Sequence, residues 1–174
     1  MENKILIAYF SRPDNNYVNG KIINLPVGNT EVAARIIQEM TGGVLFRINQ
    51  VNKYSEDYDT CTEEAQHELR ANARPELTEK LDSIDGFDTI ILGYPNWWST
   101  MPMPVWTFLE SYDFSGKIIL PLCTHEGSRM GRSENDIKKL CPEAKLQQGL
   151  AIHGGSVKSA GKDIEAWLKK SGFR

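Results

Sequence analysis

Short apolar runs alternate with amphipathic segments along the whole chain. The first run, residues 5–10, is continuously apolar and is followed at once by Ser11 and Arg12. This pattern is typical of a strand that is buried on both faces of a parallel sheet. Further strands are predicted at residues 44–48, 89–92, 117–122 and 146–152.

Helical periodicity fills the segments between these strands. After Pro104, the apolar residues Val105, Phe108, Leu109 and Tyr112 follow the spacing i, i+3, i+4 and i+7, which predicts a helix with one buried face. Other helices are predicted over residues 30–40, 60–72, 133–140 and 156–170. The alternation predicts a doubly wound α/β fold, with a five-stranded parallel sheet between two helical layers.

One short segment departs from the alternation. Asn19-Gly20 lies between the apolar pair Tyr17-Val18 and residues 21–23. Asn-Gly between apolar runs is the strongest short signal for a two-residue β-hairpin turn. A small hairpin is therefore expected as an insertion after the first strand.

Composition limits the classes of protein that the chain can belong to. Its 174 residues are 40% hydrophobic and 25% charged, which predicts one globular domain spanning residues 1–174 and excludes fibrous or wholly disordered classes. The net charge of −3 argues against nucleic-acid binding. The first apolar run is far shorter than the roughly 20 residues of a membrane span, and no targeting segment is visible, so we expect a cytoplasmic protein.

Cysteine and histidine positions favour neither a disulfide framework nor a metal site. Cys61, Cys123 and Cys141 are odd in number and widely spaced, so we interpret them as reduced thiols. His125 and His153 lie in different loops without a third ligand at a recognisable spacing. We therefore expect no metal.

Three loops follow the predicted strands at the edge where doubly wound sheets bind ligands. Gly28-Asn29-Thr30 begins a helix, where free amides and the helix dipole suit a phosphate, although such a sequence is also an ordinary helix cap. The loop from Tyr94 to Trp98 holds three aromatic residues on which a flat ligand could stack, or which pack into the core. We expect at least one of its two indoles to be packed under the loop. Residues 124–131 are polar and contain glycine, as in a binding loop or a flexible connection.

Together these segments resemble the flavodoxin-like, FMN-binding group of short-chain flavodoxins. The resemblance covers essentially the whole chain and rests on residues 7–11, 28–30, 93–98 and 123–128. It implies FMN as the cofactor, with its phosphate held by Ser11, Asn29 and Thr30. It also implies that the ribityl chain and isoalloxazine ring are bordered by Pro95, Asn96, Trp97, Trp98, Thr124, His125, Glu126, Gly127 and Ser128.

Two features depart from the group. Sixteen residues, 12–27, separate Ser11 from Gly28, so Arg12 either approaches the phosphate or points away from it. Arg129 occupies a stretch that the group often fills with glycine, and we expect its side chain to lie in solvent.

The function implied by the resemblance is electron transfer through non-covalently bound FMN. The alternative is an NAD(P)H-dependent reductase of quinones or similar small acceptors, so the chain is either an enzyme or a carrier that meets a redox partner protein. A non-enzymatic FMN-binding module is a third possibility. Residues 54–74 carry six acidic residues against two arginines, which suits either a solvated face or a docking surface for a basic redox partner. A homodimer is possible, but no sequence feature supports it.

A more distant alternative is a cysteine-dependent phosphatase. Cys123 and Arg129 are separated by five residues, at the end of a strand and before a helix, as in the phosphate cradle of those enzymes. Glu126 lies between them and would repel a phosphate dianion.

Overall fold

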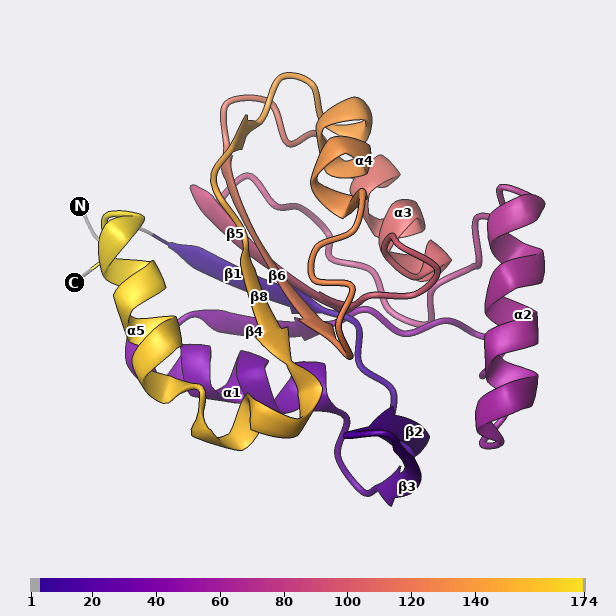
Figure 1. Ribbon diagram of the computed structural model, residues 1–174. Coiled ribbons are helices and arrows are strands. Elements are labelled where there is room, and N and C mark those ends of the chain that lie inside the picture. The colour runs from indigo at the N-terminus through magenta and orange to yellow at the C-terminus, as the bar shows by residue number, and fades with distance from the viewer. Residues whose placement is uncertain (1–3, 174) are drawn as a thin grey trace.

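The computed structural model describes residues 4–173, and its centre is a parallel sheet (Figure 1). The strands β4 (Val44–Arg47), β1 (Ile5–Tyr9), β5 (Thr89–Pro95) and β6 (Ile118–His125) lie side by side in that order. Beyond β6 lie β7 (Lys145–Leu146) and β8 (Leu150–His153), which both pair with β6. Counted as five strands along the chain, the order is 2-1-3-4-5, so the predicted doubly wound topology is confirmed.

The fifth strand differs from the expected unbroken run over residues 146–152. Its two halves, β7 and β8, pair with β6 on either side of Pro121, which has no amide hydrogen to donate to the sheet. Two groups of the intervening segment bond side chains instead: the Gly149 amide donates to Glu134 Oε2 at 3.1 Å, and the Gln148 carbonyl accepts from Trp167 Nε1 at 2.9 Å. The break between β7 and β8 is therefore set by Pro121 of the neighbouring strand β6 and by side chains of α4 and α5.

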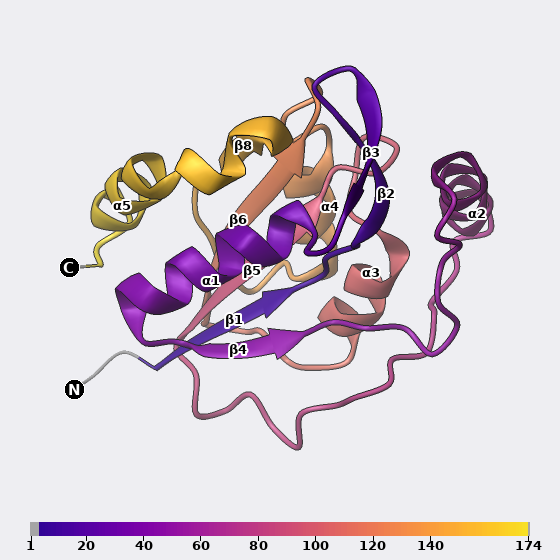
Figure 2. The ribbon, with the colours of Figure 1, turned by 90° about the horizontal axis from the view of Figure 1, so that it is seen from below.

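Helices cover both faces of the sheet (Figures 1 and 2). On one face lie α1 (Asn29–Thr41) and α5 (Gly161–Lys170), and on the other lie α3 (Met103–Glu110) and α4 (Ser133–Leu140). In β1, Ile7 packs with the α1/α5 side and Leu6 with the α3/α4 side, as expected for a strand buried on both faces. The last helix starts later than predicted, because residues Gly154–Ser159 form a separate 3-10 helix, η1.

The predicted hairpin is present as β2 (Asp14–Val18) and β3 (Lys21–Leu25). Its turn residues Asn19 and Gly20 have φ values of +52° and +82°, the conformation that Asn-Gly adopts with little strain. The hairpin stands apart from the main sheet, beyond the carboxyl end of β1 (Figure 2).

Helix α2 (Tyr58–Arg70) lies at the margin of the molecule, beyond α3 in both ribbon views (Figures 1 and 2). Asp57 caps it by accepting from the Thr60 amide at 2.9 Å. Its acidic residues belong to the segment 54–74 singled out above. No helix among residues 4–173 is long and apolar enough to cross a membrane.

Candidate functional site

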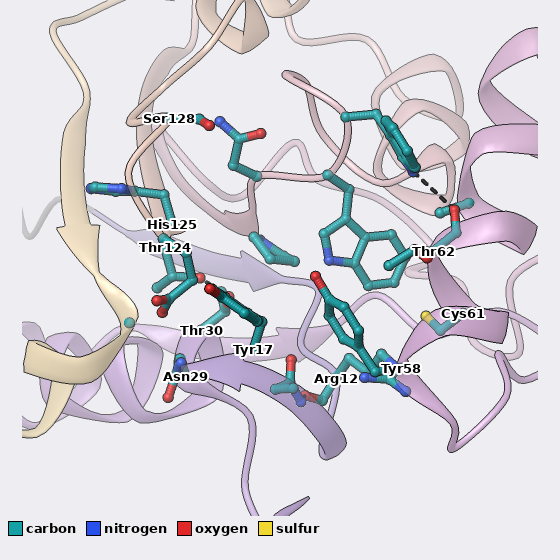
Figure 3. Close-up of a pocket in the computed structure, with 18 residues that line it drawn as sticks. Arg12, Tyr17, Asn29, Thr30, Tyr58, Cys61, Thr62, Thr124, His125 and Ser128 are labelled. Carbon is teal, nitrogen blue, oxygen red and sulfur yellow. Dashed lines mark hydrogen bonds between the residues drawn. The ribbon is translucent and has the colours of Figure 1, made fainter. Parts of the chain in front are cut away.

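A cavity of about 450 Å³ opens beyond the carboxyl ends of the central strands, a size typical of small-molecule sites (Figure 3). The three loops singled out by the sequence meet here, together with the hairpin and α2. All predicted cofactor-binding residues except Ser11 and Gly127 lie in its wall. The lining comprises Arg12, Asn16, Tyr17, Asn29, Thr30, Tyr58, Cys61, Thr62, Ala65, Pro95, Asn96, Trp97, Trp98, Thr124, His125, Glu126, Ser128 and Gly154.

The first turn of α1 forms an anion cradle at one end of this cavity. The hydroxyl of Ser11 caps the helix by accepting from the Glu31 amide at 3.0 Å. The first amides of a helix have no partner within it, so those of Asn29 and Thr30 are available to an anion. Gly28 is required here, because a Cβ at that position would collide with Ser11 Oγ and lie 2.6 Å from the Arg12 carbonyl oxygen.

The buried carboxylate of Glu31 forms two ion pairs that position the cradle, and the sequence analysis missed them. Glu31 is 6% exposed and accepts from Arg35 and from Arg47, each at 2.8 Å. Arg47 also donates to the Ser11 carbonyl oxygen at 3.1 Å, which ties the end of β4 to the cradle. Glu31 in the first helical turn, with Arg35 four residues later, was the available signal, but Arg47, which also pairs with Glu31, comes from strand β4.

The side chain of Arg12 connects two segments that are far apart in the sequence. Its guanidinium donates to the carbonyl oxygens of Asn15, Ser55 and Glu56, at 2.8 Å and 3.0 Å for the last two. The side chain is 8% exposed and so joins the base of the hairpin to the segment before α2. A contact between Arg12 and the FMN phosphate stays a prediction.

The aromatic loop divides its rings between the core and the cavity. Tyr94 is fully buried and donates from its hydroxyl to Ser133 Oγ at 2.8 Å. Trp97 packs edge-on against Phe10 and Tyr54, with ring centroids 5.2 Å and 5.0 Å away. Trp97 is thus the indole packed under the loop, and its packing leaves it in the cavity wall.

Trp98 is 46% exposed and also lines the cavity. Its Nε1 donates to the Thr62 carbonyl oxygen at 2.9 Å, which fastens the loop to α2. Its φ of +54° is unusual for an aromatic residue and is followed by +69° at Ser99. The surrounding hydrogen bonds hold this loop in a conformation that its residues would not favour alone.

Asn96 links the aromatic loop to the loop after β6. Its amide donates to the Thr124 carbonyl oxygen and its Nδ2 donates to the Arg129 carbonyl oxygen, both at 2.8 Å. Its Oδ1 accepts from the Ser99 amide at 3.1 Å. The hydroxyls of Thr30 on α1 and Thr124 on β6 are hydrogen-bonded at 2.8 Å. This bond connects the cradle directly to the end of β6.

Two histidines end the neighbouring strands β6 and β8. The Nδ1 atom of His125 accepts from the Gly127 amide at 2.8 Å, so the proton of the neutral ring is on Nε2. Burial lowers the pKa of His125, and the charges of His153 and Arg129 act in the same direction.

Glu126 accepts a hydrogen bond from the Asn19 amide at 3.1 Å and thereby attaches the tip of the hairpin to the loop after β6.

The geometry opposes the phosphatase interpretation. Cys123 is fully buried, and its thiol donates to the Arg129 carbonyl oxygen at 3.4 Å. Burial raises the pKa of the Cys123 thiol far above its usual value, whereas a nucleophile needs a thiolate. Arg129 has an exposed side chain and a φ of +53°, a conformation that glycine adopts more readily.

Comparison with known proteins agrees with this geometry. Residues 4–171 match the sequence model of the family described as Flavodoxin, so the chain belongs to the flavodoxin family. The fold expected from the resemblance is confirmed, and so is FMN as the cofactor that the family implies. The chain matches no protein in a search of curated proteins.

Solved structures of similar proteins span nearly the same length. A candidate flavoprotein from Bacteroides uniformis ATCC 8492 is 28% identical, with 95% of this chain and 99% of that chain covered and a TM-score of 0.74. Another from Bacteroides eggerthii DSM 20697 is 27% identical, with 98% and 99% covered and a TM-score of 0.78. A flavoprotein from Lactobacillus acidophilus NCFM in complex with FMN is 18% identical, with 90% and 97% covered and a TM-score of 0.62, and shares the fold.

Proposed function

We propose that this protein transfers electrons through FMN bound non-covalently in the cavity. The observation that carries the proposal is that an anion cradle and an aromatic wall share one cavity. A flavin mononucleotide needs both, because it joins a phosphate to a flat aromatic ring through a flexible chain. The residues present therefore fit FMN, and the absence of a Cβ at Gly28 lets the start of α1 lie close to Ser11 and Arg12.

FMN itself would supply the redox chemistry, by accepting and releasing electrons. The chain's own residues hold and surround it. The amides of Asn29 and Thr30 and the hydroxyl of Ser11 would anchor the phosphate at the positive end of α1. Pro95, Trp97 and the loop after β6 would border the ring and limit its contact with water.

The similar proteins support this proposal. Those from Bacteroides uniformis and Bacteroides eggerthii are described as candidate flavoproteins, and the one from Lactobacillus acidophilus was solved with FMN. The cysteines are all buried and free, which suits the reducing cytoplasmic location that we also propose.

An anaerobic visible spectrum of FMN-incubated, desalted protein tests the proposal. Retained flavin absorbance is expected, followed by bleaching with a chemical reductant and recovery with an oxidant. Bleaching by NADPH or NADH would identify a reductase, whereas bleaching only by a chemical or protein reductant would identify a carrier. Loss of all flavin on desalting, or a bound flavin that does not cycle, would refute electron transfer through FMN.

A double variant tests the phosphate anchor separately. Ser11→Ala with Thr30→Ala removes both hydroxyls near the cradle and should weaken FMN binding while the domain stays folded. Ser115→Ala, in an exposed turn far from the cavity, is the matched control. Unchanged FMN affinity in the double variant would remove these residues from the site.

A further inference from the structure

The β2–β3 hairpin begins and ends beside the anion cradle. It occupies the insertion between Ser11 and Gly28, so both of its strands lead back to the start of α1. One strand faces the protein, since Asn16 and Tyr17 of β2 lie in the cavity wall and Val18 is buried. The other strand faces outward, since the first four residues of β3 are all exposed. The hairpin therefore forms part of the cavity wall while standing apart from the main sheet (Figure 2).

The base of the hairpin is attached to the segment that leads into α2. Arg12, which is 8% exposed, donates to the carbonyl oxygens of residues 55 and 56 at 2.8 Å and 3.0 Å. The Asn15 amide donates to the second of these oxygens at 3.3 Å. Further along β2, the ring of Tyr17 lies beside that of Tyr58 on α2, with centroids 6.2 Å apart. Several contacts thus hold this end of the hairpin in place.

The tip of the hairpin rests on the loop after β6 and on η1. The Asn19 amide donates to Glu126 Oε2 at 3.1 Å. The Asn19 side chain lies against Gly155, because a Cβ on that glycine would be 2.3 Å from Asn19 Oδ1. The preceding Gly154 lies close to both Glu126 and Asn29, since a Cβ there would be 2.6 Å from a side-chain atom of each. The tip is therefore a neighbour of Asn29, the first residue of the helix that forms the cradle.

The two ends of the hairpin differ in how strongly they are attached. The base is held by a nearly buried guanidinium with several acceptors, whereas the bond between Asn19 and Glu126 at the tip is exposed to water. An exposed hydrogen bond contributes little net free energy, because water replaces it when it breaks. Local opening begins where contacts are few and solvated. The tip is thus the end that opens at the lower cost, and the base is the hinge.

We propose that the β2–β3 hairpin is a strap over the phosphate end of the site, and that release of its tip from Glu126 and Gly155 controls how fast FMN enters and leaves. This inference rests on the proposed function, since it concerns exchange of the same cofactor. The phosphate would lie at the amides of Asn29 and Thr30, between the base of the hairpin and the place where its tip rests. A closed strap slows binding and release alike, because one opening step precedes both. It prolongs the residence of FMN without raising the affinity.

A reversible cross-link at the tip tests the strap. A Cβ at Gly155 would lie 2.6 Å from Asn19 Cγ, so the Cβ atoms at positions 19 and 155 are no more than about 4 Å apart, as in a disulfide. The double variant Asn19→Cys with Gly155→Cys should therefore form a disulfide under mild oxidation, as judged by mass spectrometry of its peptides. The three native cysteines are buried, so wild type treated with the same oxidant is the control.

Stopped-flow tryptophan fluorescence measures FMN association with the apoprotein and, after dilution of the complex, FMN release. In the oxidised double variant, both rate constants should fall at least about tenfold below those of the reduced form, while the Kd for FMN changes by less than about threefold. Reduction with dithiothreitol should restore both rates. Because the two forms share one sequence, the substitutions themselves cannot account for the difference.

A shortened hairpin tests the strap in the opposite direction. Replacing residues 17–22 with Asn-Gly keeps the Asn16–Ile23 pair, the contacts of the base and a two-residue turn, but removes the tip. Association and release of FMN should both become at least about threefold faster, the effect of losing one exposed hydrogen bond. Tyr17→Leu is the matched control, because it removes the same ring and keeps the tip. It should leave the association rate within about twofold of the wild type.

The outcomes separate this inference from the proposed function. Equal rates in the oxidised and reduced double variant overturn the strap and leave FMN binding intact. Failure of the disulfide to form also overturns it, since the tip would then not lie against Gly155. A shortened hairpin whose association rate is unchanged has the same meaning. A wild type that retains no FMN on desalting refutes the proposed function, and the inference with it.

Discussion

Replacing Gly28 with alanine should damage both the stability of the fold and the binding of FMN. Gly28 has a φ of −65°, which alanine adopts without strain, so the effect of the change is steric. The new Cβ would lie 2.6 Å from the Arg12 carbonyl oxygen, and ordinary contact at 3.4 Å requires the backbones to separate by about 0.8 Å. The same Cβ collides with Ser11 Oγ, which caps α1.

The magnitude follows from these two contacts. Overpacking typically costs about 1–3 kcal/mol, and loss of an N-cap hydrogen bond costs about 1 kcal/mol more. A loss of about 2–4 kcal/mol in the free energy of unfolding lowers the melting temperature of a chain of this length by about 5–15 °C. Displacement of the Asn29 and Thr30 amides should weaken FMN binding at least about tenfold, since one hydrogen bond to a charged group contributes about 1.5–3 kcal/mol.

Thermal denaturation followed by circular dichroism measures the first effect, and titration of the apoprotein with FMN measures the second. Gly86→Ala is the control, because a Cβ there would meet no atom within 4 Å and its φ is not positive. Gly28→Ala that melts within about 2 °C of this control and binds FMN equally well would refute the reasoning.

Further predictions concern thiol reactivity, pH and fluorescence. Burial raises the pKa of all three cysteines, so iodoacetamide at pH 8 should alkylate none of them in native protein and all of them in guanidinium chloride, as judged by mass; native labelling would contradict this. The lowered pKa of His125 means that the unfolded chain takes up its proton first, so the free energy of unfolding should fall as pH decreases below about 6.5. His125→Gln should flatten that dependence in urea titrations, and an unchanged slope would exclude His125 as its source. FMN should quench tryptophan fluorescence strongly, and Trp97→Phe should lose most of that quenching whereas Trp167→Phe, on α5, should not.

Local patterns in the chain were sufficient for the arrangement of most elements. Continuous apolar runs separated by amphipathic segments require a parallel sheet with helices on both faces, since each strand must bury both of its sides. Asn19-Gly20 likewise specified the hairpin, because only residues tolerant of positive φ fit its turn. The cradle at α1 was visible for the same reason: a helix start is a local feature.

The tertiary structure alone decided which distant groups meet. Arg12 bonds carbonyl oxygens more than 40 residues away, and that separation hides its task from any local pattern. The break in the fifth strand depends on Pro121 in the neighbouring strand, which a pattern within residues 146–152 cannot reveal.

The two ends of the cavity differ in how far local sequence determines them. Sequence alone determined a flavodoxin-like fold with an anion cradle and an aromatic loop, because these depend on hydrophobic periodicity, helix termini and the residues at strand ends. Only the tertiary structure brought Tyr17 and Tyr58 together, since their contact depends on how the hairpin folds back and where α2 is anchored. Those placements result from hydrogen bonds between segments far apart in the chain, and such bonds leave no periodic signal in the sequence.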